Sequence, residues 1–333
     1  SHYIEDVGLG GKQINLASFG QGLQRHLIFT LIKLSAKYAA PSSTKKKDFD
    51  PDFTLLLYEE PEAFLHPAQQ ESLHLSLRTL ASQEPDQVLI SSHSPHFVSK
   101  QVDQIEGIIR LAKINGETKS FQIKQNTISA IFDSNIGLYK RFCDCLASDD
   151  LDDNLKQKIR NQNLGDDTPN PAEKLEEEAV RYFMWLDAER ASMFFAKHVI
   201  ICEGASEKIF IDYLFNEKWP EFRDRHIYLL DALGKFNIHR YIALLTELGI
   251  SHSVLLDSDN DAGIHGIVNA FIDERKTDLT KTTYAFDNDF EEFLGIDKPN
   301  RPDLKPLNVI VKYQRGEVAN ERIEELKTIL GAM

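Results

Sequence analysis

The sequence predicts an α/β protein with two parallel-sheet parts and a helical segment between them. Two strand–helix–strand alternations lead to this prediction, a short one in residues 54–90 and a longer one in residues 199–256. Strands separated by about ten to fifteen helical residues form βαβ units, whose neighbouring strands run parallel. The acidic stretch 143–178 between the alternations lacks strand patterns, so we expect helices there and a loop near residues 163–171.

The first alternation follows a polar loop. An N-terminal helix is expected over residues 22–39, and residues 42–52 form a loop that contains a lysine run. These lysines fit a solvated loop or a contact with a DNA backbone. Apolar strands are expected at residues 54–58 and 88–90, and the segment between them repeats its apolar residues at helical spacing, at Leu73, Leu77 and Leu80.

The second alternation is longer and more regular. Strands are expected at residues 199–202, 227–230 and 253–256, and helices at residues 208–215 and 238–248. This order predicts a Rossmann-like parallel sheet, and ligands of such sheets bind at the carboxyl ends of the strands.

Composition limits the location and the class of protein. The hydrophobic content is 42% and no apolar run approaches the roughly twenty residues of a membrane span, so we expect a soluble, cytoplasmic protein without a signal peptide. The three cysteines show no CxxC spacing, which argues against a disulfide framework and a zinc site.

The acidic balance of the chain bears on its partners. A formal net charge of -14 argues against nucleic acid, because phosphate binding relies on a positive field. Nucleic acid is not excluded if the acidic residues are concentrated in metal sites and in a solvated segment, since bound divalent ions invert the charge that a phosphate meets.

Carboxylates follow the first apolar strand directly. Glu59 and Glu60 come after this strand, and Ser91-Ser92-His93 follows the next one. Carboxylates at the end of a buried strand are costly unless they bind a cation or water, so this pair predicts a ligand site.

A second set of carboxylates follows the strands of the longer alternation. Glu203 ends one strand and Glu207 lies in the first turn of the next helix, where the helix N-terminus favours negative charge. Asp257-Ser258-Asp259-Asn260-Asp261 follows another strand, and strand alternation would point Asp257 and Asp259 to one side. Such a cluster requires cations, and Mg²⁺ is held by one or two carboxylates with water and phosphate. A calcium EF-hand is disfavoured, because its later Gly and Glu are missing.

The order of the first set of motifs resembles that of an ABC-type ATPase. Ser18-Phe19-Gly20-Gln21-Gly22 resembles the signature motif, Glu59-Glu60 the Walker B end, Leu65-His66-Pro67 the D-loop and Ser91-Ser92-His93 the H-loop. The resemblance implies that Glu59 helps to hold Mg²⁺, that Glu60 activates water and that His93 senses the γ-phosphate. It also implies that Ser18, Gly20 and Gln21 face a nucleotide bound by a partner subunit.

One motif of such an ATPase has no counterpart here. No G-x-x-x-x-G-K-[ST] phosphate loop occurs in the 333 residues. We therefore expect the N-terminal ATPase lobe to be absent or on another polypeptide, with ATP bound only by the full-length protein.

The second set of motifs resembles the Toprim signature of topoisomerases, primases and nucleases of the OLD (overcoming lysogenization defect) family. The resemblance implies that Glu203 is a metal ligand or general acid/base. Mg²⁺ or Mn²⁺, in one or two ions, would be held by Glu207, Asp257, Asp259 and Asp261.

Further segments favour the OLD branch, which includes Gabija-like anti-phage proteins. They are residues 185–190, 194–197, 234–237 and 289–294, and Lys305-Pro306. By this resemblance Glu291 completes the second metal site. Lys305, or less readily Lys312, stabilises charge on the scissile phosphate.

The sequence thus predicts three regions: the C-terminal part of an ABC-type ATPase in residues 1–140, a helical linker and dimerisation segment in 141–196, and a Toprim nuclease domain in 197–333. The expected function is Mg²⁺-dependent DNA cleavage in anti-phage defence by a homodimer, with a possible accessory subunit and no membrane partner. Two alternatives stay open. The Toprim domain could be a regulatory module of a DNA-bound ATPase or clamp, or the protein could break strands like a topoisomerase, although no winged-helix domain with a tyrosine nucleophile is apparent.

Overall fold

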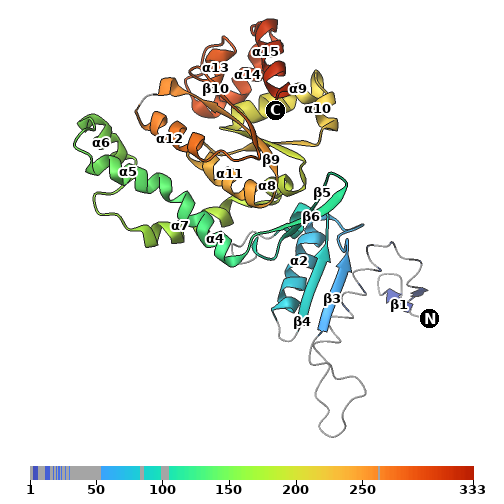
Figure 1. The fold of residues 1–333 in the computed structure, drawn as a ribbon. Helices are drawn as coiled ribbons and strands as arrows, with labels where there is room; N and C mark the ends of the chain where they lie inside the picture. Colours follow the sequence, from blue (N-terminus) through green and yellow to red (C-terminus); the bar gives the residue numbers. More distant parts are fainter. Residues whose placement is uncertain are drawn as a thin grey trace. The chain divides into compact units, whose positions relative to one another are not determined.

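The computed structural model describes residues 3–6, 12–15, 18, 20, 22, 24, 27, 30, 54–82, 86–98, 105–261 and 263–333. The chain forms two compact units, Ser1–Val98 and Ser99–Met333 (Figure 1). The lysine run, Gln21 and most of the helix expected at residues 22–39 lie outside the described residues.

The first unit contains the expected strand–helix–strand element. Strands β3 (Thr54–Glu59) and β4 (Asp86–Ser91) pair in parallel and are joined by helix α2 (Pro67–Ala81). Leu73 and Leu77 of α2 are buried against this pair, as their spacing predicts. A short 3₁₀ helix, η3 (Pro95–Phe97), follows β4, and β1 (Tyr3–Asp6) pairs antiparallel with β2 (Lys12–Asn15).

The second unit is built on a parallel sheet of order β10-β9-β7-β8. The strands are β7 (His198–Cys202), β8 (Ile227–Asp231), β9 (Ser251–Asp257) and β10 (Thr280–Phe286). The first three confirm the strands expected from the sequence. Most residues of β7 and β9 are buried, which is why these strands are continuous apolar runs in the sequence.

Helices pack on both faces of this sheet. On one face α9 (Ala205–Glu217), α14 (Lys305–Gln314) and α15 (Asn320–Gly331) share an apolar core with the strands. Figure 1 shows α11 (Ile238–Glu247) and α12 (Gly263–Glu274) on the opposite side. Short helices complete the unit, namely α8 (Ala188–Ala191), η4 (Ser192–Phe195), α10 (Glu221–Asp224), η5 (Lys235–Asn237), η6 (Asp259–Asp261), α13 (Phe290–Phe293) and η7 (Pro302–Leu304).

The acidic segment is helical, as expected. It carries α5 (Gly137–Ala147), α6 (Asp153–Asn161) and α7 (Pro171–Trp185), with a loop between α6 and α7. No helix in the described ranges is long and apolar enough to cross a membrane.

The division at Val98 lies well before the boundary expected at residue 140. The hairpin of β5 (Ile109–Ile114) and β6 (Glu117–Gln122), together with α4 (Gln125–Asn135), belongs to the second unit. Arg110 accounts for much of this attachment, because its guanidinium donates to the backbone oxygens of Phe194, Ala196, Leu248 and Gly249 at 3.1–3.3 Å. Hydrogen bonds made by a charged group to several carbonyls are individually strong.

Gly249 provides a test of this attachment. Its φ is +63°, and a Cβ there would lie 2.2 Å from Phe121 Cε1, on the ring over which Arg110 packs. Gly295 has a similar φ of +71° but open space around a Cβ, so Gly295→Ala is a matched control. We expect Gly295→Ala to lower the free energy of unfolding by about 1–2 kcal/mol, and Gly249→Ala by about 1–3 kcal/mol more. The free energies of unfolding are measured by urea denaturation. Equal losses in Gly249→Ala and Gly295→Ala would show that the hairpin does not pack tightly against this turn.

Candidate active site

The candidate active site lies at the carboxyl ends of β7 and β9. Glu203 follows β7, and its backbone N–H donates to the Leu255 oxygen at 3.0 Å, so the carboxylate stands beside the end of β9. The Asp257 N–H, at that end, donates in turn to Glu203 Oε2 at 3.0 Å. The predicted proximity of Glu203 and Asp257 is therefore observed.

Glu207 reaches the same place from the first turn of α9. Its Oε2 accepts the backbone N–H of Gly204 at 3.1 Å, so the side chain caps the helix whose N-terminus stabilises its charge. Glu291, on α13, is 1% exposed and contributes a fourth carboxylate.

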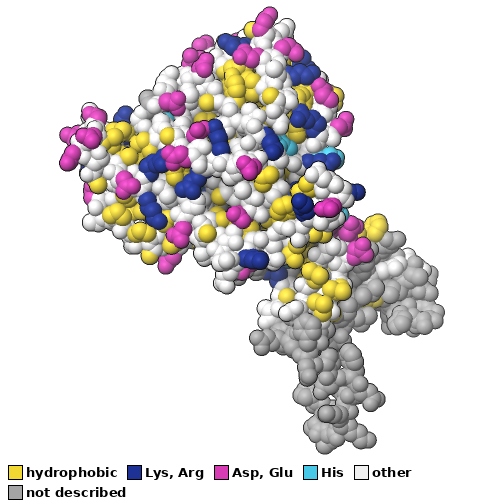
Figure 2. Space-filling view, in the orientation of Figure 1, with side chains coloured by type: hydrophobic (Ala, Val, Ile, Leu, Met, Phe, Trp, Pro, Cys, Tyr) yellow, Lys and Arg dark blue, Asp and Glu magenta, His cyan; other side chains and the backbone are white. Residues whose placement is uncertain are grey.

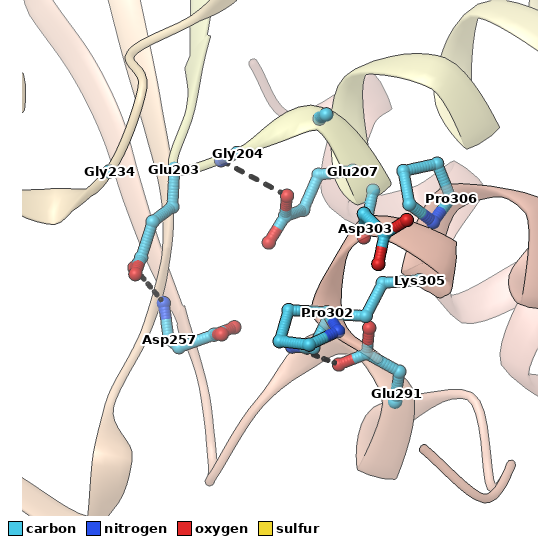
Figure 3. A pocket seen from close by; sticks show the side chains of 12 residues that line it. Glu203, Gly204, Glu207, Gly234, Asp257, Glu291, Pro302, Asp303, Lys305 and Pro306 are labelled. Carbon is cyan, nitrogen blue, oxygen red and sulfur yellow. Dashed lines mark hydrogen bonds and ion pairs between the residues drawn. The ribbon is translucent and has the colours of Figure 1, made fainter. Parts of the chain in front are cut away.

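These carboxylates line a cavity of about 300 Å³. Figure 3 shows Glu207, Asp257 and Glu291 pointing into it from α9, β9 and α13. Lys305, at the start of α14, donates to Glu291 Oε2 at 3.2 Å. The remaining wall includes Gly204, Ala205, Ser206, Gly234, Pro302, Asp303 and Pro306.

Burial and mutual repulsion make the ionised cluster costly. Burial raises the pKa of Asp257 to about 8, and the charges of Glu207 and Glu203 add to the rise. Burial likewise raises the pKa of Glu207 to about 7. The pKa of Glu203 is raised by burial, against the opposing effect of Lys235.

Two carboxylate oxygens of the cavity show why a cation fits. Asp257 Oδ1 and Glu291 Oε1 are buried and accept no hydrogen bond. A buried carboxylate oxygen without a partner is unfavourable, and hard divalent cations prefer such ligands. Within the described ranges no three acidic, His or Cys side chains are already arranged to hold an ion. Lys305 pairs with Glu291, and Lys235 pairs with Glu203 and Asp259, so these three carboxylates are held by lysines.

Comparison with known proteins agrees with this geometry. Residues 194–259 match the family model of the Toprim domain of overcoming lysogenization defect protein-like proteins. This chain carries an OLD-like Toprim domain. Residues 2–98 match the model of an AAA ATPase domain, so the expected ATPase segment is also present.

Two curated relatives contain similar segments. The chain is 38% identical to the Old nuclease of Escherichia phage P2 over 85 residues, which are 26% of this chain and 14% of that protein. It is 35% identical to the endonuclease GajA of Bacillus cereus strain VD045 over 74 residues, 22% of this chain and 13% of that protein. The matched segments thus span only about one seventh of either relative.

The acidic turn after β9 differs from the expected strand alternation. Asp259, Asn260 and Asp261 have φ values of 48°, 56° and 49°, so the strand has ended and the chain turns in the left-handed region. Asp261 is exposed and its Oδ1 accepts from Asn269 Nδ2 at 2.7 Å. It does not line the cavity, so the structure does not bring it to the other carboxylates.

Asp259 lies beside the Toprim cavity rather than on its wall. Its carboxylate is paired with Lys235 and with His265 Nδ1, the latter at 3.1 Å. Lys312, the alternative to Lys305, pairs with Glu317 and does not line the cavity.

The first unit brings together part of the predicted ATPase motif. Glu60 has a φ of 40°, and its Oε1 lies 3.4 Å from His93 Nε2. Backbone strain of this kind is often found at functional sites. Glu59, Ser18 and Gly20 are exposed.

Three residues near the sites were given no role by sequence reasoning. Glu62 accepts from Ser92 Oγ at 2.6 Å and from the His93 N–H at 3.0 Å, and so holds the His93 turn. Asp303 lines the Toprim cavity and Lys235 is buried beside it. The sequence signal for Lys235 was the segment of residues 234–237, which resembles the OLD branch but gave this lysine no role.

The raised pKa values predict how the metal-free protein responds to pH. An acid whose pKa is higher in the folded state stabilises the fold at low pH, and that stabilisation is lost as pH rises from about 4 through about 8. Asp257→Asn should therefore raise the melting temperature at pH 8.5 by at least about 2–4 °C, the shift per kcal/mol for such a domain. At pH 5, near the lower end of this range, the shift should be much smaller. Asp261→Asn is the control, and an equal shift in both variants at pH 8.5 would contradict this account.

Proposed function

We propose that this chain is a nuclease of the OLD family, which cleaves DNA in the Toprim cavity with divalent metal ions. The observation that carries the proposal is the convergence of buried carboxylates, two of whose oxygens lack partners, beside Lys305. The two relatives with similar segments are named as nucleases, and the Toprim match over residues 194–259 includes Glu203, Glu207 and Asp257; both findings support this activity.

Most charged side chains of the cavity have a role in this proposal. Glu207, Asp257 and Glu291 would bind Mg²⁺ or Mn²⁺, with Glu203 and Asp259 beside them. Such ions would supply an activated water and would stabilise the leaving oxygen. Glu203, oriented by the Asp257 N–H, accepts or returns a proton, and Lys305 places positive charge beside the phosphate.

The acidic balance of the chain is compatible with DNA under this proposal. On the face seen in Figure 2, Lys and Arg side chains are interspersed with Asp and Glu. The carboxylates inside the cavity would be neutralised by cations, so a phosphate would meet positive charge there.

The remaining assignments concern regulation and assembly. We propose that the ATPase unit regulates cleavage, with Glu59, Glu60 and His93 acting on ATP. A homodimer is proposed from α7, where Val180 and Met184 are 57% and 68% exposed. Anti-phage defence, with an accessory subunit, is the role that the OLD resemblance favours.

A plasmid assay tests the proposed function. Supercoiled DNA incubated with the chain should be nicked or linearised in Mg²⁺ or Mn²⁺ and should stay intact in EDTA. Cleavage that persists in EDTA would overturn the metal-dependent mechanism. Metal binding without any cleavage would overturn the nuclease proposal and favour a regulatory Toprim module.

A further inference from the structure

Lys235 is a buried lysine in a tightly fixed turn beside the Toprim cavity. It is 2% exposed. The preceding Gly234 has a φ of +101°, and its N–H donates to the backbone carbonyl oxygen of Glu203 at 2.8 Å. Asn237 Nδ2 donates to two backbone oxygens of the same turn at 3.0 Å, and Arg240 donates to the Phe236 oxygen at 2.6 Å.

The ammonium group of Lys235 contacts three acidic or carbonyl groups. It donates to the Asp257 backbone oxygen at 2.5 Å and to Asp259 Oδ2, and Glu203 Oε2 lies 3.8 Å away. A buried ammonium group is very costly unless it is paired, and these partners offset that cost.

The charge of Lys235 is directed to one side of the cluster. Lys235 forms ion pairs with Glu203 and Asp259. The buried carboxylate oxygens without a hydrogen-bond partner belong instead to Asp257 and Glu291. Lys235 therefore neutralises the Glu203 and Asp259 side of the cluster. On the opposite side Lys305 pairs with Glu291, and the ion pairs of the described residues include none with Glu207 or Asp257.

We propose that Lys235 is a positioning residue that acts as the fixed counter-ion of the Toprim cavity. It holds Asp259 away from the metal ions and directs them to the side of Glu207, Asp257 and Glu291. By lowering the net negative charge it also limits the affinity for divalent cations. This inference rests on the proposed function, because it assumes that the cavity binds metal.

Removal of the charge has two opposite consequences. Lys235→Met preserves most of the side-chain volume but leaves the carboxylates without their counter-ion, so the metal-free protein should melt at a lower temperature. The same variant should bind a divalent cation more tightly, because one repelling positive charge is gone. Charges a few ångströms apart near a protein surface interact strongly enough to change affinity by about tenfold or more.

The experiment is a Mn²⁺ titration followed by melting temperature, without DNA. We expect Lys235→Met to melt below wild type without metal, to gain more on Mn²⁺ addition, and to reach half of its gain at about tenfold less Mn²⁺. Lys218→Met is the control, because Lys218 pairs with Glu324 at 3.1 Å outside the cavity; it should titrate like wild type. Identical titrations of Lys235→Met and wild type would overturn the inference.

A double variant covers the case in which Lys235→Met does not fold. Lys235→Met with Asp259→Asn removes both charges of the pair, so it should fold and reach half-saturation close to wild type. A clearly weaker response would overturn the inference, because it would make Asp259 a metal ligand. If wild type itself shows no Mn²⁺-dependent gain, the metal site of the proposed function fails instead.

Discussion

Asp257→Ala and Glu203→Ala are each expected to reduce DNA cleavage by roughly a thousandfold or more. Loss of a metal ligand or of the residue that moves a proton removes several kcal/mol of transition-state stabilisation. The fold should be retained, since removing one of several mutually repelling carboxylates relieves repulsion in the metal-free state.

Rates of plasmid nicking in Mg²⁺ or Mn²⁺ measure this loss. Asp261→Ala is the matched control, because Asp261 lies in the same acidic segment but pairs with Asn269 outside the cavity. It should cleave close to the parent rate. If Asp257→Ala or Glu203→Ala also nicks at the parent rate, the active site is not in this cavity.

Lys305→Ala should be the second most damaging change, with cleavage reduced by about a hundredfold to a thousandfold. Lys305 lies on the cavity wall at 3.2 Å from Glu291, where its charge can stabilise the negative charge that develops on the phosphate. Removal of one such group from an enclosed site typically costs this much.

Lys312→Ala is the comparison that decides between the two lysines left open by the sequence. Lys312 lies further along α14 and pairs with Glu317. Single-turnover cleavage at saturating metal should be nearly unchanged in this variant. A larger loss in Lys312→Ala than in Lys305→Ala would show that the wrong lysine has been assigned.

The parallel sheet and its strand ends were predictable because their signals are local. Buried parallel strands are continuous apolar runs, so β7 and β9 could be located from composition alone. A carboxylate directly after each run marks the ligand-binding edge of the sheet. The approach of Glu203 to Asp257 follows from these two facts.

The hairpin β5–β6 was not predicted, although a signal for it exists. Asn115 and Gly116 have φ values of 52° and 88°, as a two-residue hairpin turn requires, and Asn-Gly is the preferred sequence for such a turn. The attachment of this hairpin through Arg110 depends on carbonyls about 85–140 residues away in sequence, so no local pattern could have placed the domain boundary.

The positions of the acidic residues after β9 were predicted only in part. Alternation holds while the chain is extended, but the strand ends at Asp257 and the next residues adopt positive φ. Asp259 therefore forms an ion pair with Lys235, and Asp261 accepts a hydrogen bond from Asn269. Sequence spacing could not show this, because the backbone conformation of the turn depends on contacts with the neighbouring loops.

The most direct test of the central claim is to locate Mn²⁺ in crystals of the metal-soaked protein by anomalous scattering. We expect a Mn²⁺ peak in the Toprim cavity, in contact with Asp257 and with Glu207 or Glu291, and no peak there in Asp257→Ala. A cavity without Mn²⁺ in crystals of a preparation that cleaves DNA with Mn²⁺, or a peak that persists in Asp257→Ala, would contradict it.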